Sequence, residues 1–452
     1  MSGRERVIRS SRVVLSDGIR PAVIVVRDGV IAEIVDPKRV ASVDGIDFED
    51  SVVMPGIVDT HVHINEPGRS EWEGFETATM AAAAGGVTTL IEMPLNSAPA
   101  TTTLEALQQK VAASQGKLFV DVGFWGGLVP GNSAELAKLL DHGAFGFKCF
   151  LVPSGVPEFV SVAESDLRQA LPELARIEAV LLAHAELPGP IEDATRKANQ
   201  MDRRAYSTWL LSHPPAAEDE AISLLIRLAQ EYKTRVHIVH LSSSTAVPMI
   251  REAKARGINI TVETCPHYLT IAAEEIPDGA TQFKCAPPIR EAANQEHLWA
   301  ALRDGTIDFV ASDHSPAPPQ VKCTDTGDYM RAWGGIASLQ LTLPLLWTSA
   351  HKRGFGISEV ADWLCRLPAK FAGMSRKGEI APGKEADLVV WNPDQSFQVQ
   401  ADKMFFRHKL SPYSGRTLFG VVQSTFLRGE EIYASGDFPA GRRGRVLRRG
   451  EA

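Results

Sequence analysis

The sequence contains few cysteines and no pair of the Cys-x-x-Cys type. The cysteines are odd in number and scattered along the chain, at Cys149, Cys265, Cys285, Cys323 and Cys365. Secreted domains that depend on disulfides carry a denser, even-numbered set. The pattern therefore argues against a disulfide framework and favours a reducing compartment, so we expect a cytoplasmic protein.

Long apolar runs and an excess of positive charge are also missing. No apolar stretch reaches the length of a membrane span, and the first residues, MSGRERVIRSSRVV, lack the apolar segment of a signal peptide. Lysine and arginine number 47 against 55 acidic residues, for a net charge of −8. We therefore expect neither a membrane nor a nucleic-acid partner. We expect the one basic cluster to be a loosely held, solvated C-terminus; it contains Arg442, Arg443, Arg445, Arg448 and Arg449.

Both ends of the 452-residue chain are rich in short strands and tight turns. A chain of this length is expected to form one large domain and a smaller one. We predict that residues 1–54 and 375–452 together form a small, β-sandwich-like domain. Its expected strands are Arg12–Leu15, Ala22–Val26, Val30–Val35, Asp387–Trp391, Gln398–Val399, Val421–Leu427 and Glu431–Tyr433.

The middle of the chain, residues 55–374, alternates apolar strands with helical stretches such as Phe75–Ala84 and Glu218–Tyr232. Repeated strand–helix units impose parallel strands, and eight of them fit a closed (β/α)₈ TIM barrel. The sequence thus predicts an α/β fold with a barrel as its large domain. The eight expected strands are Ile57–His63, Val87–Met93, Phe119–Phe124, Ala144–Phe150, Val180–Ala185, Arg235–His240, Asn259–Thr264 and Ile307–Asp313.

Residues of the types that bind metals cluster at the ends of these strands. His61 and His63 are two apart on a strand, so both imidazoles can point at one ion. Such a pair alone is equally compatible with exposed or packed histidines. In a barrel, however, all strands open on one face, where active sites lie. That face would gather six candidates, namely His61, His63, Lys148, His184, His240 and Asp313.

Two further histidines lie in the same segments. His237 is three residues before His240, so strand alternation predicts that it faces the helices as a hydrogen-bonded, structural histidine. His314 follows Asp313 directly and is expected to point away from the ion, as a supporting or loop residue.

Four histidines and a carboxylate suit zinc, although manganese, iron, cobalt and nickel are also compatible. Lys148 does not fit this set as it stands, because a protonated amine repels a metal ion. Its residue type alone is equally consistent with a buried or solvated lysine that pairs with a carboxylate.

The strings around these residues resemble the cyclic amidohydrolases, the family of allantoinases, dihydropyrimidinases or hydantoinases, and dihydroorotases. The similarity runs from about Val53 to Lys384 and is greatest to the allantoinase branch. The strings that carry it are PGIVDTHVHINEPGRSEWEGFETATMAAAAGGVTTLIEMPLNS from Pro55, GFKCFLVPSGV from Gly146, ETCPHYL from Glu263, KCAPPIRE from Lys284, SDHSPAPP from Ser312 and WGGIASLQ from Trp333.

The resemblance implies a site with two divalent metal ions. His61 and His63 would bind the more buried ion, His184 and His240 the second. Lys148 would carry a carbamate formed with CO₂ that bridges both. Asp313 would bind the first ion and act as the catalytic proton shuttle. A homotetramer is likewise expected from the resemblance alone.

The implied substrate is allantoin, whose hydantoin ring amide would be hydrolysed to allantoate in purine catabolism. Dihydroorotases generally carry an arginine two residues after the histidine pair, and Asn65 cannot supply that charge. Asn65 and Asn96 are candidate substrate contacts, although Asn96 could equally cap a turn. The alternatives are a dihydropyrimidinase or D-hydantoinase, or a non-catalytic scaffold on the same barrel.

Overall fold

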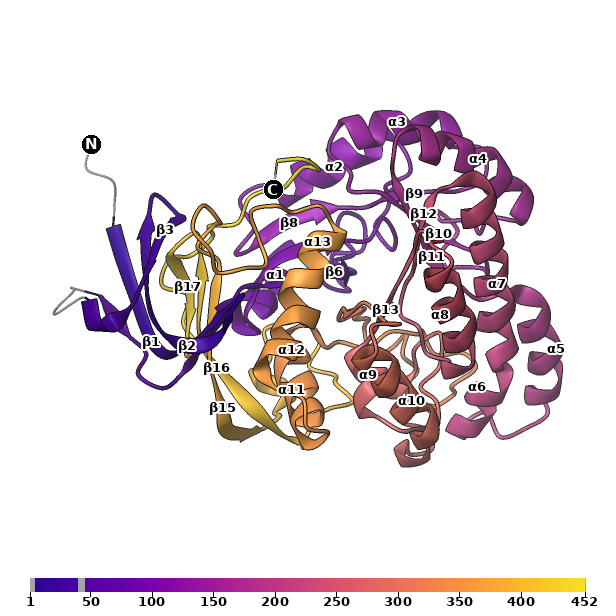
Figure 1. Cartoon of the computed structure of the whole chain (residues 1–452). Coiled ribbons are helices and arrows are strands. Elements are labelled where there is room, and N and C mark those ends of the chain that lie inside the picture. Colours follow the sequence, from indigo (N-terminus) through magenta and orange to yellow (C-terminus); the bar gives the residue numbers. More distant parts are fainter. Residues whose placement is uncertain (1–4, 40–44, 452) are drawn as a thin grey trace.

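The computed structural model describes residues 5–39 and 45–451 and contains a closed barrel with a sheet domain beside it (Figure 1). The barrel strands are β6 (Ile57–Val62), β7 (Val87–Glu92), β8 (Asp121–Phe124), β9 (Gly126–Gly127), β10 (Phe147–Phe150), β11 (Val180–His184), β12 (Arg235–Ile238), β13 (Ile260–Thr264) and β14 (Phe309–Val310).

These strands are parallel and follow the order of the chain around the barrel. β8 pairs with β7, and β9 pairs with β10, so the segment around Trp125 serves as one barrel strand in two pieces. The ring closes between β6 and the residues after β14. There Val62 forms a parallel bridge with His314, and the His63 amide donates to the His314 carbonyl at 2.8 Å. The predicted (β/α)₈ barrel is confirmed.

Helices surround the barrel. They are α1 (Phe75–Ala84), α2 (Leu104–Ser114), α3 (Ser133–Asp141), α4 (Glu164–Arg176), α5 (Pro188–Ala198), α6 (Tyr206–Ser212), α7 (Pro215–Tyr232), α8 (Val247–Ala255), α9 (Pro266–Thr270), α10 (Ala292–Arg303), α11 (Thr342–Lys352), α12 (Ile357–Ala361) and α13 (Leu367–Phe371). Shorter turns are η1 (Pro37–Arg39), η2 (Ser244–Ala246), η3 (Ala273–Glu275), η4 (Thr281–Phe283), η5 (Leu339–Leu341), η6 (Asp362–Arg366) and η7 (Ala401–Lys403).

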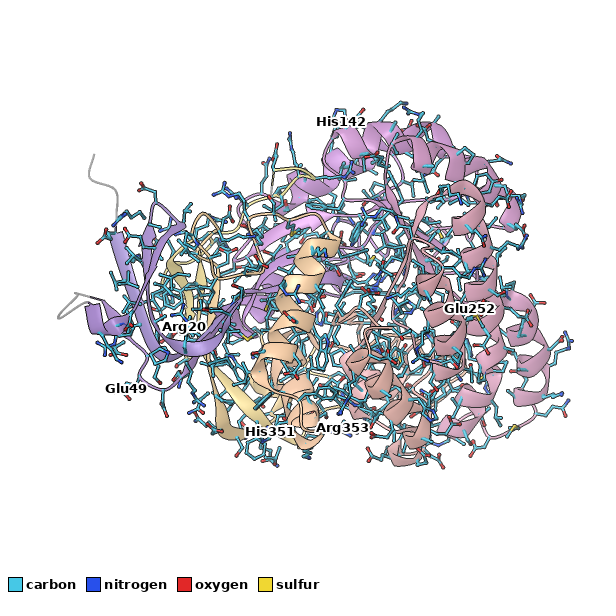
Figure 2. The ribbon with its side chains drawn as sticks, viewed as in Figure 1. Arg20, Glu49, His142, Glu252, His351 and Arg353 are labelled. Atoms are coloured by element: carbon cyan, nitrogen blue, oxygen red, sulfur yellow. The ribbon has the colours of Figure 1, made fainter. Side chains whose placement is uncertain are left out.

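The helices bury one face and expose the other. α4 buries Leu167 and Leu174 against the barrel, while Glu252 of α8 and His351 of α11 point outward (Figure 2). Among residues 5–39 and 45–451, no helix combines the length and the apolar character that a membrane crossing requires.

The barrel interior is filled by apolar side chains rather than forming a channel. Val58, Trp125, Leu182 and Phe309 are at most 1% exposed and belong to one buried cluster. Such filling is usual for eight-stranded barrels.

The two ends of the chain form one curved sheet. Its strands are β1 (Glu5–Leu15), β2 (Gly18–Arg27), β3 (Val30–Val35), β4 (Ile46–Asp47), β5 (Val52–Pro55), β15 (Leu388–Gln398), β16 (Thr417–Leu427) and β17 (Glu430–Ala434).

The N-terminal and C-terminal strands join where β5 lies between β1 and β15, in the order β17-β16-β15-β5-β1-β2-β3. The sheet folds over its own core, since the Ala386 amide donates to the Gly29 carbonyl of the β2–β3 turn at 2.9 Å. The sandwich-like arrangement built from both termini is as predicted. The domain boundaries at residues 1–54, 55–374 and 375–452 stay a prediction. Residues 1–4, 40–44 and 452 lie outside the described residues.

The expectation of a loosely held basic tail was wrong. Val446 forms a parallel bridge with Val122 of β8, and the Leu447 amide donates to the Val122 carbonyl at 2.8 Å. The side chain of Leu447 is buried, and Arg445 pairs with buried Glu385 at 2.6 Å. The sequence could not reveal this docking, because the partners of the tail lie far away along the chain.

Candidate active site

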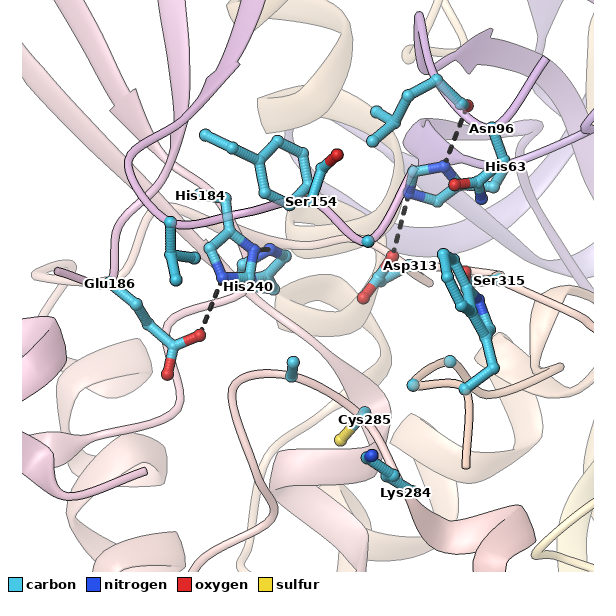
Figure 3. A pocket seen from close by; sticks show the side chains of 18 of the residues that line it. His63, Asn96, Ser154, His184, Glu186, His240, Lys284, Cys285, Asp313 and Ser315 are labelled. Carbon is cyan, nitrogen blue, oxygen red and sulfur yellow. Dashed lines mark hydrogen bonds and ion pairs between the residues drawn. The ribbon is translucent and has the colours of Figure 1, made fainter. Parts of the chain in front are cut away.

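A cavity of about 270 Å³ opens at the carboxyl ends of the barrel strands (Figure 3). It is lined by all six residues predicted to form the metal site, namely His61, His63, Lys148, His184, His240 and Asp313. Each of them is at most 7% exposed. The structure therefore brings together residues that lie within or just after β6, β10, β11, β12 and β14, as the strand-end argument predicted.

The first group consists of His61, His63 and Asp313. The Nε2 atoms of His61 and His63 lie 3.3 Å and 3.6 Å from Oδ1 of Asp313. Two ring nitrogens and a carboxylate oxygen thus converge on one point, the arrangement that a transition-metal ion requires.

The second group is the pair His184 and His240. Nδ1 of His184 lies 3.1 Å from Nε2 of His240, and the two rings meet nearly edge to face. The other nitrogen of His240, Nδ1, is buried and has no hydrogen-bond partner among the described residues. Two ring nitrogens that face each other in a buried site fit a shared cation.

Groups behind the histidines determine which ring nitrogen faces the cavity. Glu263 of β13 accepts a hydrogen bond from Nδ1 of His61, and the Leu95 carbonyl lies 3.3 Å from Nδ1 of His63. On the other side, Oε2 of Glu186 lies 2.7 Å from Nε2 of His184. Carboxylates and carbonyls commonly orient metal-binding histidines in this way.

Sequence reasoning gave no role to Glu263 or Glu186. Both positions carried a signal. Glu263 is a carboxylate within the expected strand Asn259–Thr264, and Glu186 follows His184 by two residues. A buried carboxylate requires a partner, and neighbouring histidines are an available one.

His237 is buried and hydrogen-bonded, as expected, but it does not lie apart from the site. Its Nε2 is 3.1 Å from Oε2 of Glu263, the carboxylate that also holds His61. The argument from strand alternation fails because β12 ends at Ile238 and His240 adopts a φ of 41°. His314 does point away, toward Glu73, at 3.4 Å.

Two site residues have backbones that side chains rarely adopt. His240 has a φ of 41° and Asp313 a φ of 44°, both in the left-handed region. Non-glycine residues remain there only where the surrounding structure holds them, and such positions concentrate at functional sites. The turn directs each side chain back into the cavity at the point where its strand ends.

The electrostatics favour neutral imidazoles. Burial lowers the pKa of His63, His184 and His240 well below the ordinary value. Neutral imidazole is the form that binds metals. Burial alone would raise the pKa of Glu263, but His61 and His237 outweigh it and lower that pKa to about 2.

Lys148 lies in the same buried site and has no ion pair among the described residues. It is 1% exposed, and its Nζ lies 4.9 Å from the ring centre of Phe150. Burial lowers its pKa to about 8, although Asp313 opposes the shift. Burial also raises the pKa of Asp313, against the opposing effect of His61 and Lys148.

The two asparagines are hydrogen-bonded to each other, with Asn96 donating to Oδ1 of Asn65 at 3.1 Å. Asn96 lines the cavity, but Asn65 is fully buried behind it and is not part of the described lining. Asn65 thus contacts a residue of the cavity wall, Asn96, without being part of that wall itself.

A model of the amidohydrolase family matches residues 52–432. The chain belongs to the amidohydrolase family. An allantoinase from Streptomyces avermitilis is 49% identical over 98% of this chain and 99% of its own. An allantoinase from Arabidopsis thaliana is 44% identical over 95% of this chain and 88% of its own. One from Saccharomyces cerevisiae is 43% identical over 95% of both chains.

Solved structures of amidohydrolases agree with the fold. An L-hydantoinase (dihydropyrimidinase) from Arthrobacter aurescens superposes with a TM-score of 0.92, at 31% identity, over 98% of this chain and 99% of its own. A dihydropyrimidinase from Brevibacillus agri gives a TM-score of 0.90 at 26% identity, over 99% of both chains. The family and these neighbours imply a dinuclear metal centre, and the donor groups of the cavity fit one. The chain is therefore a cyclic amidohydrolase.

Proposed function

We propose that the protein is an allantoinase, which hydrolyses the hydantoin ring amide of allantoin to give allantoate. The observation that carries this proposal is 38–49% identity to allantoinases over nearly the whole chain. The cavity supports it, because it offers both metal-binding groups and a carboxylate at one polar centre.

The proposed ligands follow the two groups of the cavity. His61, His63 and Asp313 hold one ion, and His184 with His240 holds the other. Bound divalent ions lower the pKa of water from 15.7 to about 7 and polarise a carbonyl. An amide requires both effects, since it is a poor electrophile and neutral water is a poor nucleophile.

Lys148 is proposed to carry a carbamate. Its amine would attack CO₂ and lose a proton, which replaces a cation by an anion with two oxygens. The support is geometric: Lys148 is buried among metal-binding groups and has no carboxylate partner in the described structure. A bare cation at this place would repel the ions that the four histidines suit.

Asp313 is proposed to move the proton. Its carboxylate first accepts the proton of the attacking water and then returns it to the leaving ring nitrogen, so it acts in turn as base and acid. Without that proton the nitrogen would leave as a poorly stabilised anion. The support is its position, since Oδ1 lies within 3.6 Å of two cavity-facing histidine nitrogens and the side chain lines the cavity.

Asn96 is proposed to contact the substrate, with Asn65 as the group that orients it. Oδ1 of Asn65 accepts a hydrogen bond from Nδ2 of Asn96, so the side-chain Oδ1 of Asn96 is the atom proposed to face the substrate.

Finer features are also proposals. Zinc is the proposed metal, because nitrogen-rich sites suit it. A cytoplasmic location is supported by the five cysteines, each of which is a free thiol. A homotetramer rests on resemblance to the family alone.

A substrate panel tests the function. Purified, metal-replete protein would be assayed on allantoin, hydantoin, dihydrouracil and dihydroorotate. We expect the highest kcat/KM on allantoin and essentially none on dihydroorotate, because residue 65 is an asparagine rather than the arginine that dihydroorotases generally carry two residues after the histidine pair. The second candidate is a dihydropyrimidinase, which the structural neighbours favour. A higher kcat/KM on dihydrouracil than on allantoin would assign the protein to it.

A further inference from the structure

One wall of the catalytic cavity carries polar and planar groups that take no direct part in the proposed hydrolysis, although one of them, Glu186, also orients His184. We call it the α6 wall; it consists of Glu186, Trp209, His213 and Lys284, all of which line the cavity. The ligand that we assign to this wall rests on the proposed function.

Glu186 presents an unused acceptor. Its Oε2 holds His184 at 2.7 Å, whereas its Oε1 is buried and has no partner among the described residues. The side chain is 1% exposed and points toward the cavity beside His184 (Figure 3). A buried oxygen without a donor is costly, so a ligand that supplies N–H groups would be favoured here.

Lys284 presents unused donors. Its Nζ lies 3.9 Å from the ring centre of Trp209 and donates to the Ala332 carbonyl at 2.5 Å. An ammonium has three N–H groups, so the carbonyl does not use all of them. The side chain is 5% exposed and has no ion pair among the described residues.

Flat rings connect these two groups. Trp209 and His213 lie with ring centres 4.0 Å apart. Trp209 Nε1 donates to the Cys285 carbonyl at 3.1 Å, and Nδ1 of His213 lies 2.8 Å from the Ser212 hydroxyl, so these two ring atoms are engaged elsewhere. The wall therefore combines an acceptor, a cationic donor and planar surface.

We propose that the α6 wall binds the ureido substituent of allantoin and thereby sets specificity. A ureido group is planar and has N–H donors at one edge and a carbonyl acceptor at the other. Oε1 of Glu186 would accept from the N–H groups, Lys284 would donate to the carbonyl, and the rings would pack on the plane. An alkyl substituent would leave Oε1 of Glu186 and the remaining N–H groups of Lys284 without partners, and a site built to hydrogen-bond a substrate discriminates against such an analogue.

The test compares allantoin with 5-isobutylhydantoin, whose substituent has the shape of a ureido group without its polar atoms. Lys284→Met keeps a chain of similar length against Trp209 but removes the donors. We expect the ratio of kcat/KM for the two substrates to fall by about 10- to 100-fold, as for the loss of a hydrogen bond to a charged group. Glu186→Gln should lower the same ratio. If this variant also disturbs His184, both substrates lose activity equally, because both use the same metal centre, and the ratio is unaffected by that loss.

Lys322→Met is the matched control. Lys322 is also a buried lysine without an ion pair among the described residues, but its Nζ donates to the Lys284 and Gly335 carbonyls and it does not line the cavity. We expect its ratio to match that of the wild type. Equal losses on both substrates in Lys284→Met and Glu186→Gln would overturn the assignment of the wall. Failure of the proposed function would look different, because the unmodified enzyme would then not prefer allantoin at all.

Discussion

Nδ1 of His184 and Nε2 of His240 face each other across 3.1 Å, and neither atom has a second hydrogen-bond partner among the described residues. Glu186 holds the remote nitrogen of His184, so the facing nitrogen is free to bind. On the opposite side of the cavity, His61 and His63 converge on Asp313. The site thus contains two nitrogen-rich cradles, with Lys148 lining the same cavity.

The two cradles lead to a prediction about metal content. Purified protein should hold close to two transition-metal ions per chain, and chelation should abolish activity. His240→Ala should remove one donor of the second cradle, so its metal content should fall toward one ion per chain. Elemental analysis checks both values. Full activity after complete removal of metal would refute the dinuclear reading.

Lys148→Ala should lose metal and activity together, because it removes the proposed bridging oxygens. Short carboxylic acids added to this variant should restore part of the activity, since their oxygens can take the place of the carbamate. Lys148→Arg is a useful control, because it keeps a charged, long side chain that cannot form a carbamate, and it should stay inactive with or without added acid. A crystal structure that shows an unmodified amine at Lys148 with both ions bound would contradict this prediction.

A buried ionic cluster around Asp121, the first residue of β8, links the barrel to the C-terminal segment. Asp121 pairs with Lys377 at 3.0 Å and Arg428 at 2.6 Å, and Lys377 also pairs with Asp387 at 2.6 Å. Asp121 and Lys377 are at most 1% exposed. Because removal of one partner leaves a buried charge, such clusters are sensitive to substitution.

Asp121→Asn should therefore lower the free energy of unfolding by about 3 kcal/mol, the lower end for a broken buried pair, since Lys377 retains other partners. Burial would raise the pKa of Asp121, but Lys377 and Arg428 outweigh it and lower the pKa. Because the pKa of Asp121 is lower in the folded state, its ionised carboxylate contributes stability that is fully present above the unfolded pKa of about 3.9. This contribution is lost as the pH falls through the folded pKa.

Urea unfolding at several pH values checks this prediction. The difference between the wild type and Asp121→Asn should be constant near neutral pH and shrink below about pH 4. Asp394→Asn is the control, because Asp394 pairs with Arg12 at 3.3 Å on the surface and is 78% exposed. The control should change stability by less than about 1 kcal/mol. A difference for Asp121→Asn that grew toward acid pH would have the wrong sign.

The sequence predicted the barrel and the six cavity residues because both depend on local patterns. Strand–helix alternation gives the barrel, and the barrel gathers all strand ends at one face, so His61 and Asp313 meet although they lie far apart in the chain. What it did not predict depends on geometry between segments. The shared contact of His61 and His237 with Glu263 depends on how three separate strands lie together, and the docking of Leu447 depends on a bridge between the C-terminal segment and β8.

The role of Asp313 as the proton shuttle can be separated from its role as a ligand. Its left-handed backbone turns the carboxylate into the cavity, 3.3 Å from His61 and 3.6 Å from His63. Asparagine at this position still offers one oxygen to a metal but cannot accept and return a proton at neutral pH. If Asp313 is only a ligand, the metal content and the rate of Asp313→Asn should fall together.

If Asp313 is the shuttle, Asp313→Asn should keep much of its metal and still lose about 10²–10⁴-fold in rate, the usual contribution of general acid–base catalysis. The loss should be in kcat rather than in KM, because proton transfer belongs to the transition state and not to substrate binding. His314→Asn is the matched control, since His314 is adjacent in sequence but turns toward Glu73. A variant at Asp313 with both ions bound and near-normal kcat would remove the proposed role and leave the proton transfer to another group of the cavity.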